Sequence, residues 1–358
     1  MADEKELTPG KFFPADMKAP SREDVIAALA EYGIEDGEGK GISLIDSSHS
    51  ANDIRLNYII DKKWVLRFCN APEMTENRMR ELNRLIGRYT EFGLRCPAFI
   101  TDGSGNFFHE RNGFLCYLSE YVDLPTAYEL DLPKAEADAL WNEVLESVAA
   151  FAERYKGEDL SDTMGMYSLF DLNPFDRLLG KDEKQQNLDN LLARLRELGE
   201  DKLAERLNAK NGQIREKLKA VYRDLPRCVF QGDENFSNML VDEEHHFAGL
   251  IDFNLAGTEV VVNQFANLGG GFDEEITEPI GAKTRLEHAL ADYAKTRERL
   301  LSRYNATEEE KIALEWYTWI ALTAGWPQVC FFLEGIKNEA LRPEILELIS
   351  LLAELPCP

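Results

Sequence analysis

Three residues in the second half of the chain, Asp233, Asn238 and Asp252, have the types and the spacing of a phosphate-transfer site. They lie in Q-G-D-E-N-F-S-N-M-L-V-D (231–242) and in G-L-I-D-F (249–253). Carboxylate and amide oxygens are ligands that Mg²⁺ accepts, and Mg²⁺ fills its remaining positions with water and phosphate oxygens. A carboxylate that does not bind the metal can take the proton of an attacking hydroxyl. The pattern therefore predicts Mg²⁺-dependent transfer of a phosphoryl group.

A β-hairpin has to position these residues. Residues 238–242 and 246–253 are two hydrophobic runs around the polar turn E-E-H-H. If the turn is centred near His245, antiparallel pairing predicts Asn238 opposite Asp252 at the open mouth, with Cβ atoms about 4.5–5.5 Å apart. Asp233 enters on the preceding loop. The alternative interpretation is turn chemistry alone, since Asp and Asn favour turns.

The rest of the chain divides into a strand-rich part followed by a helical part. Alternating apolar residues predict strands in the first third, and apolar residues at three-to-four spacing predict helices after Pro125. The elements expected in the first third are a helix over 21–34, strands between 40 and 70 with a hairpin tip at 61–63, a helix over 73–93 that ends at Gly93, and further strands up to 122. Those expected in the remainder are an apolar helical stripe over 141–155, a charged helical stretch over 182–222, strands over 227–253 and helices to the end.

Composition excludes several classes of protein. The 358 residues carry a net charge of −25, which should repel nucleic acid and anionic membrane surfaces. The six cysteines are scattered, without a C-x-x-C pair, and indicate reduced, mostly buried thiols. The N-terminus lacks an apolar signal core, and the apolar stretch 312–333 is interrupted by polar residues, which favours a buried helix or helix pair over a membrane span. We expect a cytoplasmic protein without nucleic-acid or membrane partners, and its oligomeric state is left open.

The segment 231–253 resembles the aminoglycoside phosphotransferase/choline kinase family, whose signature is H-G-D-x-x-x-x-N followed by a hydrophobic strand and a metal-binding Asp. The resemblance implies that Asp233 is the catalytic residue and that Asn238 and Asp252 bind the metal. It also implies a bilobal α+β, protein-kinase-like fold, with ATP or GTP and Mg²⁺ as cofactors. Gln231 stands where the family usually has His, and its amide can hold the loop by the same kind of hydrogen bond.

The resemblance extends into the first third of the chain. W-V-L-R-F (64–68) resembles the strand that carries the phosphate-pairing cation, which is then Arg67. An acidic partner is expected on the following helix, with a surface role as the alternative interpretation for both residues. The implied positions are Glu81 for that partner, with Glu76 as the alternative; Ser119, Glu120 and Tyr121 for the interlobe connector that holds the nucleobase; and Ser48, in the turn 47–53, for the phosphate loop. The implied lobes are 1–122, with 1–22 as a lead-in, and 123–358.

The acceptor is a small molecule with a hydroxyl group. An amine-bearing acceptor, such as an aminoglycoside or amino alcohol, competes with a sugar or an amino-acid alcohol. Two features bear on this choice, although a solvated loop and helical core packing are the favoured interpretations: the acidic loop 269–279, with Asp273, Glu274, Glu275 and Glu278, and the aromatic run 316–319 with Trp326. The alternative function is a pseudokinase-like nucleotide-binding module. Gln231 supports it, and the presence of Asp233, Asn238 and Asp252 counts against it.

Overall fold

The structure, a computed structural model, describes residues 10, 13, 18–34, 41–71, 73–157, 182–272 and 278–356. These residues form two compact units. The described residues of Met1–Leu132 and Asn235–Asp252 form unit 1, and those of Pro133–Leu160, Met164–Glu234 and Phe253–Pro358 form unit 2. The division into functional lobes at 122/123 stays a prediction.

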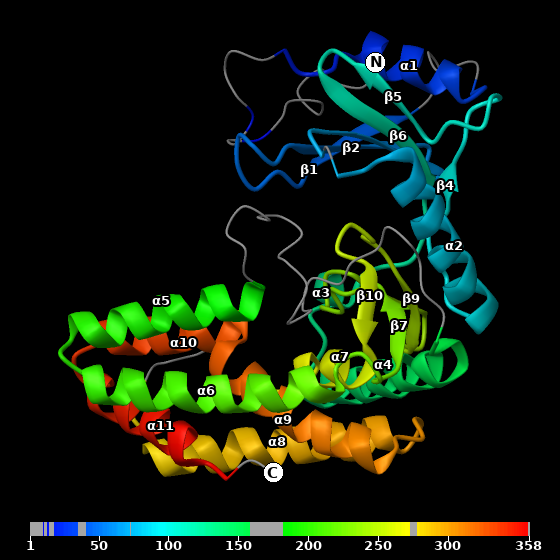
Figure 1. Ribbon diagram of the computed structural model, residues 1–358. Coiled ribbons are helices and arrows are strands. Elements are labelled where there is room, and N and C mark those ends of the chain that lie inside the picture. The colour runs from blue at the N-terminus through cyan, green and yellow to red at the C-terminus, as the bar shows by residue number, and fades with distance from the viewer. Residues whose placement is uncertain are drawn as a thin grey trace. The chain divides into compact units, whose positions relative to one another are not determined.

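Unit 1 is built on an antiparallel sheet, as predicted (Figure 1). The tip of its hairpin β2–β3 lies at 61–63, where Asp61 and Lys62 have positive φ angles. The strand order is β1(Ile42–Asp46), β2(Arg55–Ile60), β3(Trp64–Cys69), β6(Phe114–Glu120) and β4(Phe99–Ile100), with β5(Phe108–Arg111) also paired to β6.

Two helices of unit 1 confirm the predicted start and stop signals. The helix α1(Arg22–Glu31) begins at Ser21, which forms a capping box with Asp24, and its buried residues join the core with apolar residues of β2 and β3. The helix α2(Glu76–Phe92) begins at Thr75 and ends at Gly93, whose φ of 108° is left-handed.

The predicted hairpin near the end of unit 1 is present. Its strands are β8(Met239–Val241) and β9(Phe247–Leu250), which pair antiparallel. The Arg95 N–H donates to the Ala248 carbonyl at 2.8 Å, and the Arg95 carbonyl accepts from the Leu250 N–H at 3.2 Å. A Cβ at Gly249 would overlap the Arg95 carbonyl, so a glycine is required there. Val241 donates to the carbonyl of Pro125, ahead of the short helix α3(Ala127–Leu130).

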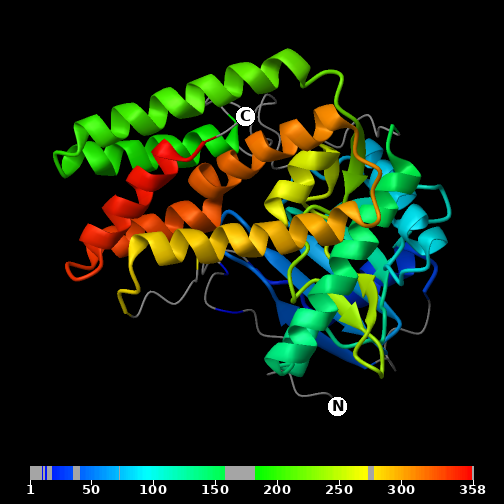
Figure 2. The ribbon, with the colours of Figure 1, turned by 90° about the horizontal axis from the view of Figure 1, so that it is seen from below.

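Unit 2 is mainly helical (Figures 1 and 2). The predicted stretch 182–222 forms two helices side by side, because Gly199, with a φ of 80°, reverses the chain between them. The helices are α4(Lys134–Tyr155), α5(Glu183–Glu197), α6(Asp201–Val221), α7(Val261–Asn267), α8(Ala282–Leu301), α9(Glu308–Ala324), α10(Trp326–Lys337) and α11(Arg342–Glu354). A two-stranded sheet pairs β7(Arg227–Phe230) with β10(Gly257–Val260), and β10 was not predicted from the sequence.

The apolar C-terminal segment packs inside unit 2. The stretch 312–333 falls in the helix pair α9 and α10. Tyr317 and Trp319 are buried, and the Trp319 indole donates to the Leu352 carbonyl at 2.9 Å, which confirms core packing for these two residues of the run 316–319. None of the described helices is long and apolar enough to cross a membrane.

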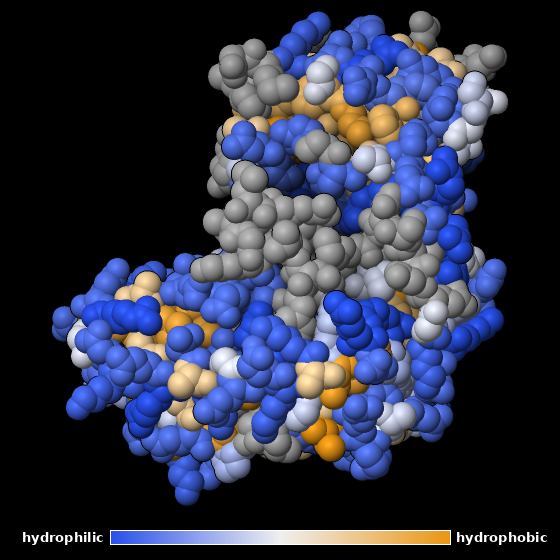
Figure 3. Space-filling model, viewed as in Figure 1, coloured by the Kyte–Doolittle hydropathy of each residue, from blue (hydrophilic) through white to orange (hydrophobic). Residues whose placement is uncertain are grey.

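The surface side chains are mostly polar, as the charged composition predicts. Figure 3 shows mostly hydrophilic residues on the visible face, with hydrophobic residues in small patches. The five cysteines within the described ranges are free thiols, and four of them are buried, as predicted. Cys357 lies outside the described residues.

Candidate active site

Arg67 lies in the centre of the unit 1 sheet, between two polar side chains. Antiparallel register places Asn57 of β2 and Tyr117 of β6 directly beside it. The Arg67 Nε donates to Asn57 Oδ1 at 2.6 Å, and its Nη1 donates to the Tyr117 hydroxyl at 3.1 Å. The side chain is only 18% exposed, so a surface role is excluded. Neither neighbour was predicted from the sequence, although a polar residue inside the hydrophobic strand R-L-N-Y-I-I was a signal for Asn57.

The electrostatic surroundings keep Arg67 charged. Burial alone would lower the pKa of its guanidinium, but Tyr117 and the carboxylate of Asp252 outweigh it, and the pKa is raised above its ordinary value. The Asp252 Oδ1 lies 3.9 Å from the Arg67 Nη1. The structure therefore brings together the predicted phosphate-pairing cation and one predicted metal ligand.

The hairpin pairs one residue away from the predicted register. Met239 faces Leu250, and the Asn238 carbonyl accepts from the Ile251 N–H at 3.0 Å, so Asn238 does not face Asp252 directly. Two features cause the shift. A bulge interrupts the ladder at Leu240/Val241, and the turn is closed from Asp242, whose Oδ1 accepts the N–H groups of Glu244 and His246.

Asn238 and Asp252 remain at the open mouth of the hairpin. Asn238 is buried and immediately precedes β8, while Asp252 lies two residues after β9 in a left-handed conformation, with a φ of 55°. An amide oxygen and a carboxylate are ligands that suit a phosphate-bound divalent cation such as Mg²⁺, and the guanidinium of Arg67 lies beside the carboxylate. Their role as metal ligands stays a prediction.

The helix predicted to carry the acidic partner of Arg67 places both candidates in other contacts. Glu81 is buried and pairs with Arg84 at 3.1 Å. The Oε1 of Glu76 accepts from the Phe107 N–H at 2.9 Å. Pairing of Arg67 with either glutamate stays a prediction, whereas Asp252 is a carboxylate that the structure places near it.

The predicted nucleotide-binding loops are partly occupied by their own hydrogen bonds. Ser48 lies in the turn between β1 and β2, where its hydroxyl accepts the Arg55 N–H at 2.9 Å. In the connector, the N–H groups of Glu120 and Tyr121 donate to the carbonyls at 98 and 63. Ser119 pairs within the sheet on both sides. A nucleobase bound at the connector would therefore use backbone groups other than these two N–H donors, and the three assignments stay predictions.

The loop that leads to Asp233 belongs to unit 2 and is held tightly. Gln231 is fully buried, and its side-chain oxygen accepts the Asp233 N–H at 2.7 Å, so the amide fixes the loop as predicted. Gly232 has a φ of 84°, and a Cβ there would lie 2.7 Å from the Leu255 carbonyl oxygen. Only glycine satisfies both conditions. The next residue, Glu234, had no signal in the sequence, and its carboxylate accepts from Gln264 of α7 at 2.9 Å.

Asp233 lines a cavity of about 1070 Å³ within unit 2. Its walls come from α5, the segment 267–272, α8 and α10. Among the lining residues that the structure describes, four carboxylates outnumber one lysine: Asp233, Glu183, Asp292 and Glu334 against Lys184. Trp326 at the start of α10 also lines it and is 61% exposed.

Glu183 at the wall of this cavity forms an ion pair with the neighbouring Lys184. Its Oε1 accepts from Asn187 at 2.6 Å, while its Oε2 is shielded from solvent and has no hydrogen-bond donor among the described residues. The ammonium of Lys184 lies 3.7 Å from that oxygen and donates to Asn267 at 2.7 Å. Burial lowers the pKa of Lys184. The sequence did not indicate that Glu183 lines a cavity, because this residue lies within a charged helix.

Among the described residues of the predicted acidic loop, those at its start line the cavity. Gly269, Gly271 and Phe272 line the wall. Asp273, Glu274 and Glu275 lie outside the described residues, and the Glu278 carbonyl accepts from Arg285 at 2.9 Å.

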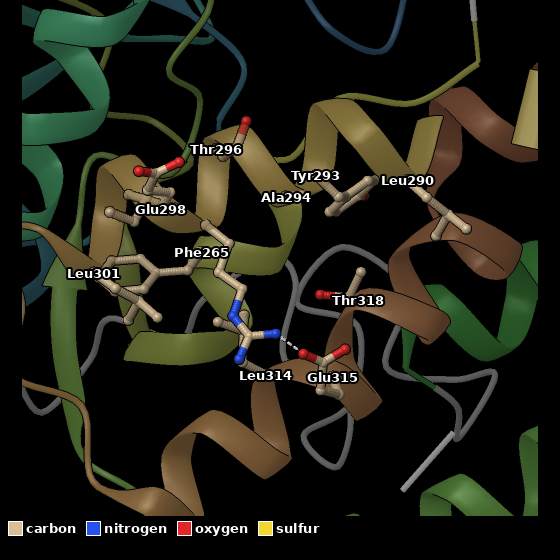
Figure 4. A pocket seen from close by; sticks show the side chains of 12 residues that line it. Phe265, Leu290, Tyr293, Ala294, Thr296, Glu298, Leu301, Leu314, Glu315 and Thr318 are labelled. Carbon is tan, nitrogen blue, oxygen red and sulfur yellow. Dashed lines mark ion pairs between the residues drawn. The ribbon is translucent and has the colours of Figure 1, made fainter. Parts of the chain in front are cut away.

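A second, smaller cavity of about 360 Å³ lies between α7, α8 and α9 of unit 2 (Figure 4). Its walls are mostly apolar, and an ion pair joins Arg297 of α8 to Glu315 of α9. Tyr293 lines both cavities. The predicted site residues do not line this smaller cavity, whereas Asp233 lines the larger one, which is the candidate site for the acceptor.

Comparison with known proteins agrees with this arrangement. The model of the phosphotransferase enzyme family matches residues 49–301, which is more than half of the chain and includes every predicted site residue except Ser48. The chain belongs to this family. The predictions of a small-molecule kinase and of a protein-kinase-like α+β fold are thereby confirmed.

Two solved structures show the fold of this phosphotransferase. The microcompartment-associated aminopropanol kinase is 12% identical with a TM-score of 0.52, over 94% of this chain and 96% of that one. Amicoumacin kinase, in complex with AMP-PNP and Ca²⁺, is 8% identical with a TM-score of 0.51, over 87% of this chain and 88% of that one. No curated protein matches the chain with significant sequence similarity.

Proposed function

We propose that this phosphotransferase moves the γ-phosphate of ATP or GTP to a hydroxyl of a small, amine-bearing molecule. The observation that carries the proposal is the position of Asp233 on the wall of an acidic cavity of about 1070 Å³. Cavities that hold small ligands commonly have volumes of about 300–1,000 Å³. The cavity is therefore large enough for an acceptor whose hydroxyl approaches Asp233.

Each of the proposed site residues has a separate role in the reaction. Asp233 orients the acceptor hydroxyl and takes its proton as the hydroxyl oxygen bonds to the γ-phosphorus and the bond to the β-phosphate oxygen breaks. Arg67, held by Asn57 and Tyr117, places a fixed positive charge for the phosphates. Asn238 and Asp252 would hold a divalent ion such as Mg²⁺, which when bound neutralises charge on the phosphate oxygens. Positioning and electrostatics supply most of the rate enhancement in such a site.

The charge of the cavity supports an amine-bearing acceptor. Glu183, Asp292 and Glu334 line it besides Asp233. An ammonium group supplies the opposite charge. The exposed ring of Trp326 can stack on the same cation. The names of the aminopropanol and amicoumacin kinases, which share the fold, are in keeping with this acceptor class and with a nucleotide and a divalent metal.

The test is transfer to paired acceptors with and without an amine. Matched amino alcohols and their N-acetyl derivatives would be offered with Mg²⁺ and ATP or GTP, and phosphorylated product would be followed by ³¹P NMR. We expect the free amines to be preferred. Asp233→Ala should lower transfer by about 10²–10⁴-fold and leave nucleotide affinity intact, because the base acts on the acceptor.

Two results would contradict the proposal. Near-wild-type transfer by Asp233→Ala would remove Asp233 from the reaction. Preference for the acetylated partners would remove the amine from the acceptor class. Nucleotide binding without transfer to any hydroxyl would instead indicate a regulatory module.

A further inference from the structure

Two polar side chains on the wall of the larger cavity form no hydrogen bond with any residue that the structure describes. They are the carboxamide of Gln328 on α10 and the hydroxyl of Tyr293 on α8. Their exposed fractions are only 9% and 7%. Two other amides on the same wall, Asn187 and Asn267, donate to backbone carbonyls at 3.1 Å and 2.7 Å. A buried polar group without a partner costs free energy, so the partner of Gln328 and Tyr293 must enter the cavity.

The run G-G-G at the start of the acidic loop lets both side chains lie against this wall. Its first and third members, Gly269 and Gly271, line the cavity themselves. A Cβ at Gly269 would overlap the Tyr293 ring at Cε1 and at Cζ, the atom that carries the hydroxyl. A Cβ at Gly271 would overlap the Gln328 Nε2, and a Cβ at Gly325 would overlap the Gln328 Oε1. The glycines therefore leave the space that these two polar groups occupy.

We propose that Gln328 and Tyr293 bind a second hydroxyl of the acceptor, so that the enzyme prefers amino diols and polyols to amino alcohols with one hydroxyl. The inference rests on the proposed function, in which another hydroxyl is phosphorylated beside Asp233. A hydroxyl both donates and accepts, as do a carboxamide and a phenol, so it can bond to either residue. An acceptor without it leaves both groups buried and unpartnered, which costs more than the bond itself contributes.

A matched pair of acceptors tests this inference. Serinol carries an amine and two hydroxyls, and alaninol differs from it by the loss of one hydroxyl. Phosphate transfer to each would be measured as kcat/KM, and binding of each without nucleotide would be measured by calorimetry. We expect the wild type to favour serinol roughly tenfold over either enantiomer of alaninol in both measurements. Tyr293→Phe and Gln328→Leu should each reduce this preference to about threefold or less.

The stability of the variants separates this role from a structural one. Tyr293→Phe removes a hydroxyl without a partner in the described residues, so its midpoint of urea unfolding should not fall. Tyr304→Phe is the matched control, because its buried hydroxyl donates to Glu310 at 2.6 Å and it is not among the residues that line the two cavities. It should lower the midpoint and leave the preference for serinol unchanged.

Two results would overturn the inference. Equal treatment of serinol and alaninol by the wild type, whether both are accepted or both are rejected, would show that no second hydroxyl is bound. A serinol preference that is undiminished in Tyr293→Phe and in Gln328→Leu would assign it to other residues. Failure of the proposed function would look different, because serinol would then bind in preference to alaninol and neither would be phosphorylated.

Discussion

Gly232 is the residue whose replacement most directly tests how the fold positions Asp233. Its φ is 84°, and a Cβ there would lie 2.7 Å from the Leu255 carbonyl oxygen, where ordinary contacts begin at 3.4 Å. The chain offers a matched control in the same unit, because Gly199 has a φ of 80° and nothing within 4 Å of its Cβ position. The two alanine variants therefore share the cost of the backbone conformation and differ in the close approach.

The expected magnitudes follow from that difference. A left-handed φ costs an alanine about 1–2 kcal/mol, so Gly199→Ala should lower the free energy of unfolding by about that amount. Gly232→Ala adds the overlap with a backbone oxygen, for which overpacking typically costs about 1–3 kcal/mol more. Relief of the overlap moves the loop beside Asp233, and a displacement of about 1 Å near a reacting group can cost roughly 10²-fold in rate.

Urea unfolding followed by tryptophan fluorescence would measure the two stabilities, and initial rates of transfer would measure the catalytic effect. We expect Gly232→Ala to lose both stability and kcat, and Gly199→Ala to keep its kcat within about threefold. Equal losses of kcat in the two variants, or full activity in Gly232→Ala, would refute the argument that the close approach positions the base.

Three further predictions concern other contacts. Asn57→Ala removes the acceptor 2.6 Å from the Arg67 Nε, and the KM for nucleotide should rise roughly tenfold in steady-state assays, while the KM for acceptor should not change. Trp326→Ala should raise the KM for an amine-bearing acceptor about fivefold, with no change in nucleotide affinity measured by calorimetry. Glu234 has a folded-state pKa of about 7 against an ordinary 4.5, so the folded protein holds a proton that the unfolded chain has released, and stability falls as pH rises across that interval. Glu234→Gln should therefore gain stability over the wild type by up to about 3 kcal/mol above pH 7, and no such gain should appear below pH 4.5 in urea unfolding.

The sequence predicted those features that depend on local pattern. The hairpin tip at 61–63, the helix that stops at Gly93 and the hairpin beyond Asn238 follow from turn chemistry and from periodicity within one segment. The hydrogen bond from the Asp233 N–H to the Gln231 side-chain oxygen could also be expected, because it joins residues two apart in the chain.

The remaining features depend on contacts between distant segments. The neighbours of Arg67, Asn57 and Tyr117, are set by the register of three strands, and register depends on turns and bulges that a pattern does not reveal. A bulge likewise moved the partner of Asn238 by one residue. The state of Glu234 follows from burial against α7, which the hydropathy of a loop does not indicate.

Hydrogen bonds within the turn of the β8–β9 hairpin hold its tip, so the structure of the tip does not depend on the residues at the open end. The Asp242 carboxylate accepts two backbone N–H groups of the turn, while contacts of Arg95 with β9 fix the strands. Glu243 and Glu244 are exposed at the tip. This end of the hairpin is therefore a suitable attachment point for a reporter: a cysteine in place of Glu244 could carry a fluorophore on the same hairpin as Asn238 without altering that residue. Four of the five described native thiols are buried, which favours labelling at the introduced position.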